Sequence, residues 1–315
     1  MIYTVTLNPA VDYQYVVPEM EFNQVLRAVD THIDMGGKGF NVSRMLAELQ
    51  VASSALGFIG GNNGAVLKEG LETLGIDTKL ISIPGETRLN VSIVTETHDT
   101  YIKVNEPGPD VPPEKVAELL ALIQKLAAPG DWWILSGSVP PDVDTAIYAK
   151  IIKLVRSVGA DTVLDTSGEP LRLGIDARPT VVKPNAEEAI QLTGSSLANQ
   201  KEIVLAARDI GALGADNVVI SLGKEGALLD DGETAWLLST PTIKEKNPIG
   251  AGDSLVAGLV SKLHQNDSFP NALKWGIACG AATAGESGTA VGSRADVEAL
   301  VLQITSKEVS NAIHG

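Results

Sequence analysis

The sequence predicts an α/β fold in which helices flank a central, mostly parallel sheet. Short apolar runs rich in β-branched residues alternate along the chain with amphipathic segments, as in strand–helix–strand units. This alternation of strands and helices indicates a parallel sheet covered by helices on both faces. Hydrophobic residues make up 44% of the 315 residues and charged residues 20%, so the chain is globular rather than disordered or collagen-like.

The alternation runs from the first residues to the last predicted helix. In chain order we expect a strand at 2–7, a helix at 42–49, a strand at 53–58, a helix at 65–74, a strand at 132–135, a helix at 146–155, strands at 162–164, 181–182 and 218–222, and a helix at 255–263. In the first helix, Val42, Met45, Leu46 and Leu49 recur on one helical face. Because ligands bind beyond the carboxyl ends of such strands, the loops after strands are expected to carry function.

Two segments, approximately 10–35 and 88–106, interrupt this alternation. Apolar and polar residues alternate there without an intervening helix, as in Leu89-Asn90-Val91-Ser92-Ile93. The pattern predicts a small antiparallel sheet, which we interpret as a lid; edge strands of the main sheet are the alternative. No repeat or long linker divides the chain, so one domain is expected over 1–315.

Charge and composition exclude several classes of protein. The chain carries 24 basic and 39 acidic side chains, a net charge of −15, whereas a nucleic-acid binder needs a surplus of Lys and Arg. The single Cys279 cannot form an internal disulfide, and no Cys/His spacing resembles a zinc site.

Apolar stretches give no membrane signal. The N-terminus has neither the basic start nor the long apolar run of a signal peptide, and no run of about 18 apolar residues occurs. The Gly- and Ala-rich stretch at 275–285 is expected to be a tightly packed core helix. We therefore expect no membrane contact and a cytoplasmic location.

The strongest local motif is Gly250-Ala251-Gly252-Asp253, followed by an amphipathic helix. The glycines permit a tight turn, and free amides at a helix start can hold an anion. In the first turn, Asp253 would lie beside a bound phosphate and accept a proton from an attacking hydroxyl. The alternative for this motif is a helix cap.

A second glycine turn, Gly36-Gly37-Lys38-Gly39, also leads into a helix, and Gly57 to Gly64 follows the next strand. Neither cluster has the spacing of a P-loop or of a dinucleotide-binding fingerprint. Lys38 and Asn41 place a cation and an amide beside a backbone that a ligand can approach closely. An ordinary turn is the alternative.

Polar groups follow further predicted strands. Asn185 and Glu188 lie three residues apart on one helical face, and their oxygens suit Mg²⁺ held directly or through water. A helix N-cap is the other interpretation of Asn185, and the two roles are compatible. Ser221, Gly223 and Gly226 allow a nucleotide to lie against the backbone. The remaining polar groups on such loops are Asp12, Arg88, Ser138 and Lys183.

These motifs together resemble the ribokinase-like PfkB family of sugar kinases, along essentially the whole chain. The residues from Gly36 to Gly64 resemble the family's first signature, and 165–169, 183–185 and 250–253 resemble its later ones. The segments 7–12, 87–91, 105–109 and 247–248 are similar to the branch of 1-phosphofructokinases and tagatose-6-phosphate kinases. One departure is Gln50, where the family usually has Gly, and this should change only a helix C-cap.

The resemblance implies a ribokinase-like fold with a β-lid used in dimerisation. It assigns Asp253 as the proton acceptor, with an anion hole formed by Gly250, Ala251 and Gly252. Implied ATP contacts are Lys183, Asn185, Ser221, Gly223 and Gly226, and the implied magnesium-associated pair, acting through water, is Asn185 and Glu188. Implied sugar-phosphate contacts are Asp12, Gly37, Lys38, Asn41, Arg88 and Ser138.

The implied activity is transfer of the ATP γ-phosphate to fructose 1-phosphate, giving fructose 1,6-bisphosphate, with Mg²⁺ as cofactor. A tagatose-6-phosphate kinase needs the same machinery, and the sequence leaves the two sugars open. A non-catalytic sugar-phosphate-binding regulator is the alternative from another class. The expected partners are ATP, a ketohexose phosphate and a second copy of the chain. On so acidic a chain the cleft must be locally basic, through Lys38, Arg88 and either Lys103 or Arg27, the last reaching a neighbouring subunit's site.

Overall fold

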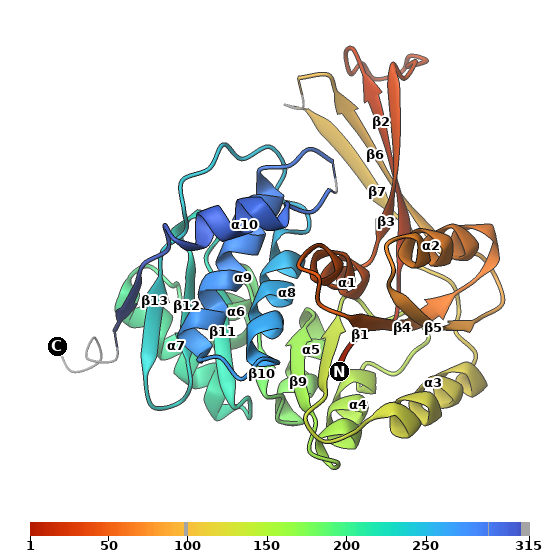
Figure 1. Ribbon diagram of the computed structural model, residues 1–315. Helices are drawn as coiled ribbons and strands as arrows, with labels where there is room; N and C mark the ends of the chain where they lie inside the picture. Colours follow the sequence, from red (N-terminus) through yellow and green to blue (C-terminus); the bar gives the residue numbers. More distant parts are fainter. Residues whose placement is uncertain (98–99, 289, 310–315) are drawn as a thin grey trace.

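The computed structural model describes residues 1–97, 100–288 and 290–309 and contains two sheets (Figure 1). The main sheet has ten strands, and every neighbouring pair from β11 to β5 is parallel, whereas the strands beyond β11 are antiparallel. In spatial order its strands are β14 (Ser306–Glu308), β13 (Ala235–Leu238), β12 (Ala227–Asp230), β11 (Asn217–Ser221), β10 (Val181–Val182), β9 (Asp161–Asp165), β8 (Trp132–Ser136), β1 (Ile2–Thr6), β4 (Ser53–Ile59) and β5 (Asp77–Ser82). The predicted fold class is confirmed.

Helices cover both faces of the main sheet. One face carries α1 (Lys38–Glu48), α2 (Gly61–Thr73), α8 (Ala251–Leu263) and α9 (Phe269–Ala284), with α10 (Arg294–Val301) packed on α9. The other carries α3 (Pro113–Leu126), α4 (Ile147–Arg156), α5 (Gly168–Asp176), α6 (Ala186–Thr193) and α7 (Gln200–Ala212). Because both faces are covered, strands such as β1, β4 and β8 are buried at every residue.

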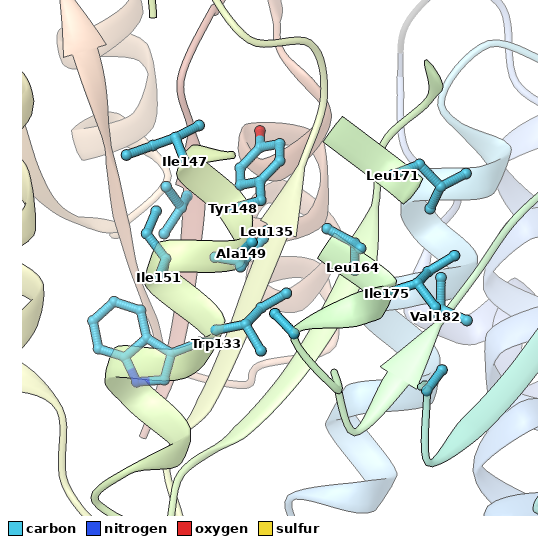
Figure 2. Close-up of a cluster of buried hydrophobic side chains, with 14 of the residues drawn as sticks. Trp133, Leu135, Ile147, Tyr148, Ala149, Ile151, Leu164, Leu171, Ile175 and Val182 are labelled. Carbon is cyan, nitrogen blue, oxygen red and sulfur yellow. The ribbon is translucent and has the colours of Figure 1, made fainter. Parts of the chain in front are cut away.

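A large apolar cluster lies between the sheet and the second group of helices. Figure 2 shows its centre, where Trp133 and Leu135 of β8 meet Ile147, Tyr148 and Ile151 of α4. The apolar positions of α4 recur at the helical period, so that one face is buried. Tyr148 buries its ring there, and its hydroxyl donates to the Ser136 carbonyl at 3.0 Å, which satisfies its polar atom.

Small residues let α8 and α9 pack closely. A Cβ added to Gly258 would lie 2.5 Å from the Trp275 carbonyl oxygen and 2.7 Å from Cys279 Sγ. This close approach explains the Gly- and Ala-rich stretch and confirms the expected core helix at 275–285. No helix in the described part of the chain is both long and apolar enough to span a membrane.

The second sheet, here called the lid sheet, stands away from the main body (Figure 1). In spatial order it consists of β3 (Asp30–Gly36), β2 (Ala10–Val17), β6 (Arg88–Thr95) and β7 (Tyr101–Asn105). The expectation of a purely antiparallel sheet is wrong, because the central strands β2 and β6 are parallel. Each follows closely on a strand of the parallel main sheet, β1 or β5, so both enter the lid in the same direction. The outer pairs, β2–β3 and β6–β7, are antiparallel.

Some elements differ from the sequence expectation. Helix α1 begins at Lys38 rather than at 42, only the start of α6 had been anticipated, and the helices α3, α5, α7 and α10 had not been assigned. Gln50 follows α1 in a left-handed conformation with φ 60°, which is the C-cap change expected from the departure at that position. Parts of the predicted segments, residues 98–99 of the lid and 289 and 310–315 of the single domain, lie outside the described residues.

Candidate active site

A cavity of about 1510 Å³ lies at the carboxyl ends of the main-sheet strands, beneath the lid sheet. This is the edge at which strand-exit loops converge in a parallel sheet. The predicted residues that line it are Gly37, Lys38, Asn41, Arg88, Ser138, Lys183, Asn185, Ser221, Gly223, Gly226, Gly250, Ala251, Gly252 and Asp253. The structure thus brings together residues that are far apart in the sequence.

The helix α8 points its N-terminus into this cavity. Gly250 is its N-cap and has φ 80°, a left-handed conformation that a Cβ would strain. The Ala251 amide already donates to the Pro248 carbonyl at 3.2 Å, which differs from its expected place in the anion hole. The next amides, of Gly252 and Asp253, have no backbone acceptor among the described residues. These two amides can therefore receive an anion.

Asp253 lies in the first turn of α8 and is 6% exposed. The amide Nδ2 of Asn41 donates to its Oδ2 at 2.8 Å, which fixes the carboxyl group at the cavity wall. Burial, followed by the nearby charge of Asp165, raises the pKa of Asp253 to about 7. A carboxylate with such a pKa is suited to accept a proton near neutral pH.

Two lysines meet one carboxylate beside Asp253. Lys38 Nζ and Lys183 Nζ each lie 3.2 Å from Asp165 Oδ1. Although burial acts to raise the pKa of Asp165, Lys183 and Lys38 lower it below the ordinary value, and Asp165 in turn raises the pKa of Lys38. Both shifts favour the charged forms of Asp165 and Lys38, and the site sets two lysine side chains against one carboxylate.

Asn185 and Glu188 form a capping box at the start of α6. Asn185 Oδ1 accepts from the Glu188 amide at 2.8 Å, and Glu188 Oε2 accepts from the Asn185 amide at 2.9 Å. Asn185 lines the cavity, and Glu188 is not among the lining residues, although its charge helps to raise the pKa of Lys38. Within the described part of the chain, no group of three or more His, Cys, Asp or Glu side chains could hold a metal ion.

One end of the cavity is formed by the loop after β11 and by apolar side chains. Gly226 has φ 96°, and a Cβ there would collide with the Leu238 carbonyl, so the turn requires glycine. Ser221 and Gly223 lie beside it. The apolar wall, which the sequence interpretation missed, includes Ile243, Ile249, Ile277, Ala281 and Ala284.

The other end of the cavity lies under the lid sheet. Arg88 donates through Nε and Nη2 to the Asn8 carbonyl at 3.2 and 3.0 Å, and through Nη1 to the Glu106 carbonyl at 3.0 Å. Lys103 also faces the cavity, with Asn90 and Asn105.

Three predicted residues lie outside the cavity lining. Asp12 is half-buried behind the wall, where its Oδ1 accepts from Asn90 Nδ2 at 2.7 Å, and burial raises its pKa. Glu188 does not line the cavity either, as described above. Arg27 is exposed on the loop between β2 and β3.

Several lining residues were missed by the sequence interpretation: Thr6, Asn8, Asn90, Asn105, Asp165 and Thr166. Asp165 and Thr166 had a usable signal, since they directly follow the strand predicted at 162–164 and belong to a motif that was quoted without a role. Asn8 follows the first strand and had the same signal. The lid asparagines had none, because alternation in a strand does not reveal which face meets a ligand.

A doubly wound α/β fold whose cavity joins a helix N-terminus to several cations is suited to phosphorylated ligands. Residues 5–296 match the pfkB family carbohydrate kinases. The chain belongs to the pfkB family and is a carbohydrate kinase.

The similar proteins include kinases of two related sugars. The chain is 35% identical to the 1-phosphofructokinase of Borreliella burgdorferi, over 90% of its own length and 92% of the relative's. It is 36% identical to the tagatose-6-phosphate kinase of Staphylococcus epidermidis, over 92% and 94% of the two chains. The crystal structure of phosphofructokinase-2 from Escherichia coli in complex with potassium matches with a TM-score of 0.91 and 29% identity, covering 96% of this chain and 98% of that one.

Proposed function

We propose that the protein transfers the γ-phosphate of ATP to fructose 1-phosphate and forms fructose 1,6-bisphosphate. The observation that carries the proposal is the buried Asp253 at the start of α8, which accepts a hydrogen bond from Asn41 and lies near two helix-start amides and the charges of two lysines. A pure binding protein needs no proton acceptor at such a place, so the arrangement argues against a regulator on the same scaffold. The similarity to 1-phosphofructokinases of more than one organism supports the choice of sugar.

In the proposed reaction, Asp253 accepts the proton of the 6-hydroxyl as that oxygen attacks the γ-phosphorus. The bond between the γ-phosphorus and the bridging oxygen of ADP breaks, and ADP leaves. The amides of Gly252 and Asp253 and the ammonium groups of Lys38 and Lys183 stabilise the negative charge on the transferring group. Lys183 lies close to the amides, since a Cβ on Gly252 would be 3.7 Å from its Nζ.

ATP is proposed to bind at the end of the cavity that has the apolar wall. The loop with Ser221, Gly223 and Gly226 offers close backbone approach, and Ile243 and Ile277 offer apolar contact for the base. Lys183 and Asn185 line the same cavity, and we propose them as contacts of the ATP phosphates.

The capping box limits how the proposed Mg²⁺ can bind. One oxygen of Asn185 and one of Glu188 already accept backbone hydrogen bonds, so the pair fits a hydrated ion held through water and phosphate rather than an all-protein cage. When bound, Mg²⁺ would neutralise charge on the nucleotide phosphates.

The sugar phosphate is proposed to bind under the lid, with its phosphate near Arg88 and Lys103 and its hydroxyls near Asn41, Asn90 and Asn105. Further contacts are proposed for Gly37 and Ser138, and Asp12 would act through Asn90. Closure of the lid over the sugar would exclude water and so favour transfer over hydrolysis.

The lid is also proposed to form a homodimer. Register places apolar side chains together on the face that points away from the cavity, here called the outer lid face: Tyr13, Tyr15, Ile33, Val91, Ile93, Ile102 and Val104. Ile33 and Val104 are 54% and 60% exposed. Soluble monomers rarely leave large contiguous apolar surfaces open to solvent. A second copy would cover this face and would bring Arg27 towards the neighbouring site.

Tagatose 6-phosphate is the second candidate, favoured by the similarity to tagatose-6-phosphate kinases. The test is ATP turnover with fructose 1-phosphate, tagatose 6-phosphate and fructose 6-phosphate side by side, compared by kcat/KM. We expect the highest ratio with fructose 1-phosphate. A higher ratio with tagatose 6-phosphate would assign the second activity to the same site, and no turnover with any of them would contradict the proposal.

A further inference from the structure

Asp165 holds two ammonium groups on a single oxygen. It ends β9, and its side chain is 1% exposed. Lys38 Nζ and Lys183 Nζ each lie 3.2 Å from Oδ1. The second oxygen, Oδ2, is buried and has no hydrogen-bond partner in the described part of the chain. A buried carboxylate that leaves one oxygen unpaired is not arranged for maximum stability.

The two lysines come from different segments of the chain that line the cavity. Lys38 begins α1 next to Gly37, on the side of the proposed sugar, and its side chain is 42% exposed. Lys183 follows β10 two residues before Asn185, on the side of the proposed nucleotide, and its side chain is 4% exposed. Asp165 therefore contacts one lysine from each of the two proposed substrate sites.

Another buried carboxylate of this protein shows the contrast. Asp230 ends β12 outside the cavity and is 3% exposed. Its Oδ2 accepts from Arg208 Nε at 3.2 Å and its Oδ1 from the Gly232 amide at 2.9 Å. Both oxygens are satisfied by one cation and the backbone, as in a structural ion pair. Asp165 instead gathers two flexible cations at the place where charge moves.

We propose that Asp165 is a positioning residue, which fixes Lys38 and Lys183 on the two sides of the transferring phosphoryl group. A lysine has four rotatable bonds, and holding its ammonium group in advance removes reorganisation from the reaction step. Two ammonium groups against one carboxylate leave one net positive charge, which can stabilise the transferring phosphoryl group. This inference rests on the proposed function, because it requires phosphoryl transfer in the cavity.

The first test is Asp165→Asn, with Asp230→Asn as the matched control. We expect kcat of Asp165→Asn to fall on the order of 10²-fold, while the KM values for ATP and sugar phosphate change far less. Asp230→Asn removes the charge of a similarly buried carboxylate, 3% exposed against 1% for Asp165, and should keep wild-type kcat. Wild-type kcat in Asp165→Asn, or an equal loss in the control, would overturn the proposal.

The pH profile distinguishes positioning from general stability. The charged groups that face Asp253 are Asp165, Lys38 and Lys183, and Asn41 faces it as a hydrogen-bond donor. Since the charge of Asp165 raises the pKa of Asp253, its removal should move the acid limb of kcat/KM to lower pH. The control should leave the limb in place. An unmoved limb in Asp165→Asn would indicate a structural role and overturn the proposal.

Asp165→Glu distinguishes the effect of the negative charge from the effect of its position. It also provides a second variant in case Asp165→Asn does not fold. It keeps the negative charge between the lysines but shifts the oxygen by one methylene. We expect at least about a tenfold loss of kcat with the acid limb unmoved, because a displacement of about 1 Å costs that much or more. Wild-type kcat in Asp165→Glu would contradict positioning. Inactivity of the wild type with all three sugars would instead contradict the proposed function.

Discussion

The two sheets that enclose the cavity differ in how the rest of the protein supports them. Main-sheet strands such as β1, β4 and β8 are buried at every residue, whereas all five residues of β7 in the lid sheet are exposed. Asp253 and Asp165 belong to the buried side, and Arg88 and Lys103 to the lid side.

The difference indicates that the main body and the lid sheet have different roles. A proton acceptor needs a low dielectric and fixed neighbours, which only the main body supplies. The proposed closure of the lid sheet over the sugar would require contacts that can break, and its exposed contacts are individually weaker. Substitutions at the buried end should therefore change kcat, and substitutions at the lid end should change KM and assembly.

The largest effect is expected at the buried end. Asp253→Asn should lower kcat on the order of 10³-fold, because the attacking hydroxyl loses its proton acceptor. The side chain keeps its size, so sugar-phosphate binding measured by calorimetry should remain largely intact. Unchanged turnover would show that Asp253 is not the proton acceptor. It would also contradict the expectation that the buried end of the cavity controls kcat.

The outer lid face should control assembly. Ile93→Lys would place an unpaired charge in the proposed dimer interface and should raise the dimer Kd by about 100-fold or more, measured by sedimentation equilibrium. Leu213→Lys at the end of α7 is the control, since Leu213 is also exposed (45%) but lies far from the lid. Equal behaviour of the two variants would show that the lid face is not the interface.

Loss of a lid cation should have a smaller effect on binding. Lys103→Met should raise KM for the sugar phosphate about tenfold, with kcat nearly unchanged, because an exposed ammonium group gives only part of a charged hydrogen bond. Lys68→Met, on the exposed side of α2, is the control and should leave KM unchanged. A loss of kcat with unchanged KM in Lys103→Met would contradict the proposed difference in roles.

The smallest effect concerns the main body alone. Gln50 has φ 60°, and Gly there should raise the free energy of unfolding by about 0.5–1 kcal/mol without changing activity. Gln50→Ala is the control, because it loses the same 3.0 Å hydrogen bond from Arg294 but keeps the Cβ. A gain in Gln50→Ala equal to that in Gln50→Gly would exclude backbone strain as the cause. Denaturant unfolding measures both.

The sequence predicted the fold class and the loops that line the cavity because both depend on local signals. Glycine turns and polar residues after apolar runs mark strand exits, and a parallel sheet brings those exits to one edge. The expected cytoplasmic location and the single-domain organisation stay predictions.

Features that depend on contacts far apart in the sequence were not predictable. Lys38 and Asp165 are separated by 127 positions, and no local pattern shows that their side chains meet. The parallel pairing of β2 with β6 follows from where β1 and β5 end in space, which strand alternation does not record. The hydrogen bond from the Ala251 amide to the Pro248 carbonyl was likewise not predictable, because it depends on the course of the backbone in the turn.

The central claim is that the buried end of the cavity holds Asp253 ready to accept a proton near neutral pH. The most direct test is a carbon-13 NMR titration of the aspartate carboxyl groups in the substrate-free protein, with Asp253→Asn identifying the signal. The account predicts one carboxyl signal with a pKa of about 7 that is absent from the variant. A signal for Asp253 that titrates near the ordinary aspartate value of about 4 would contradict it.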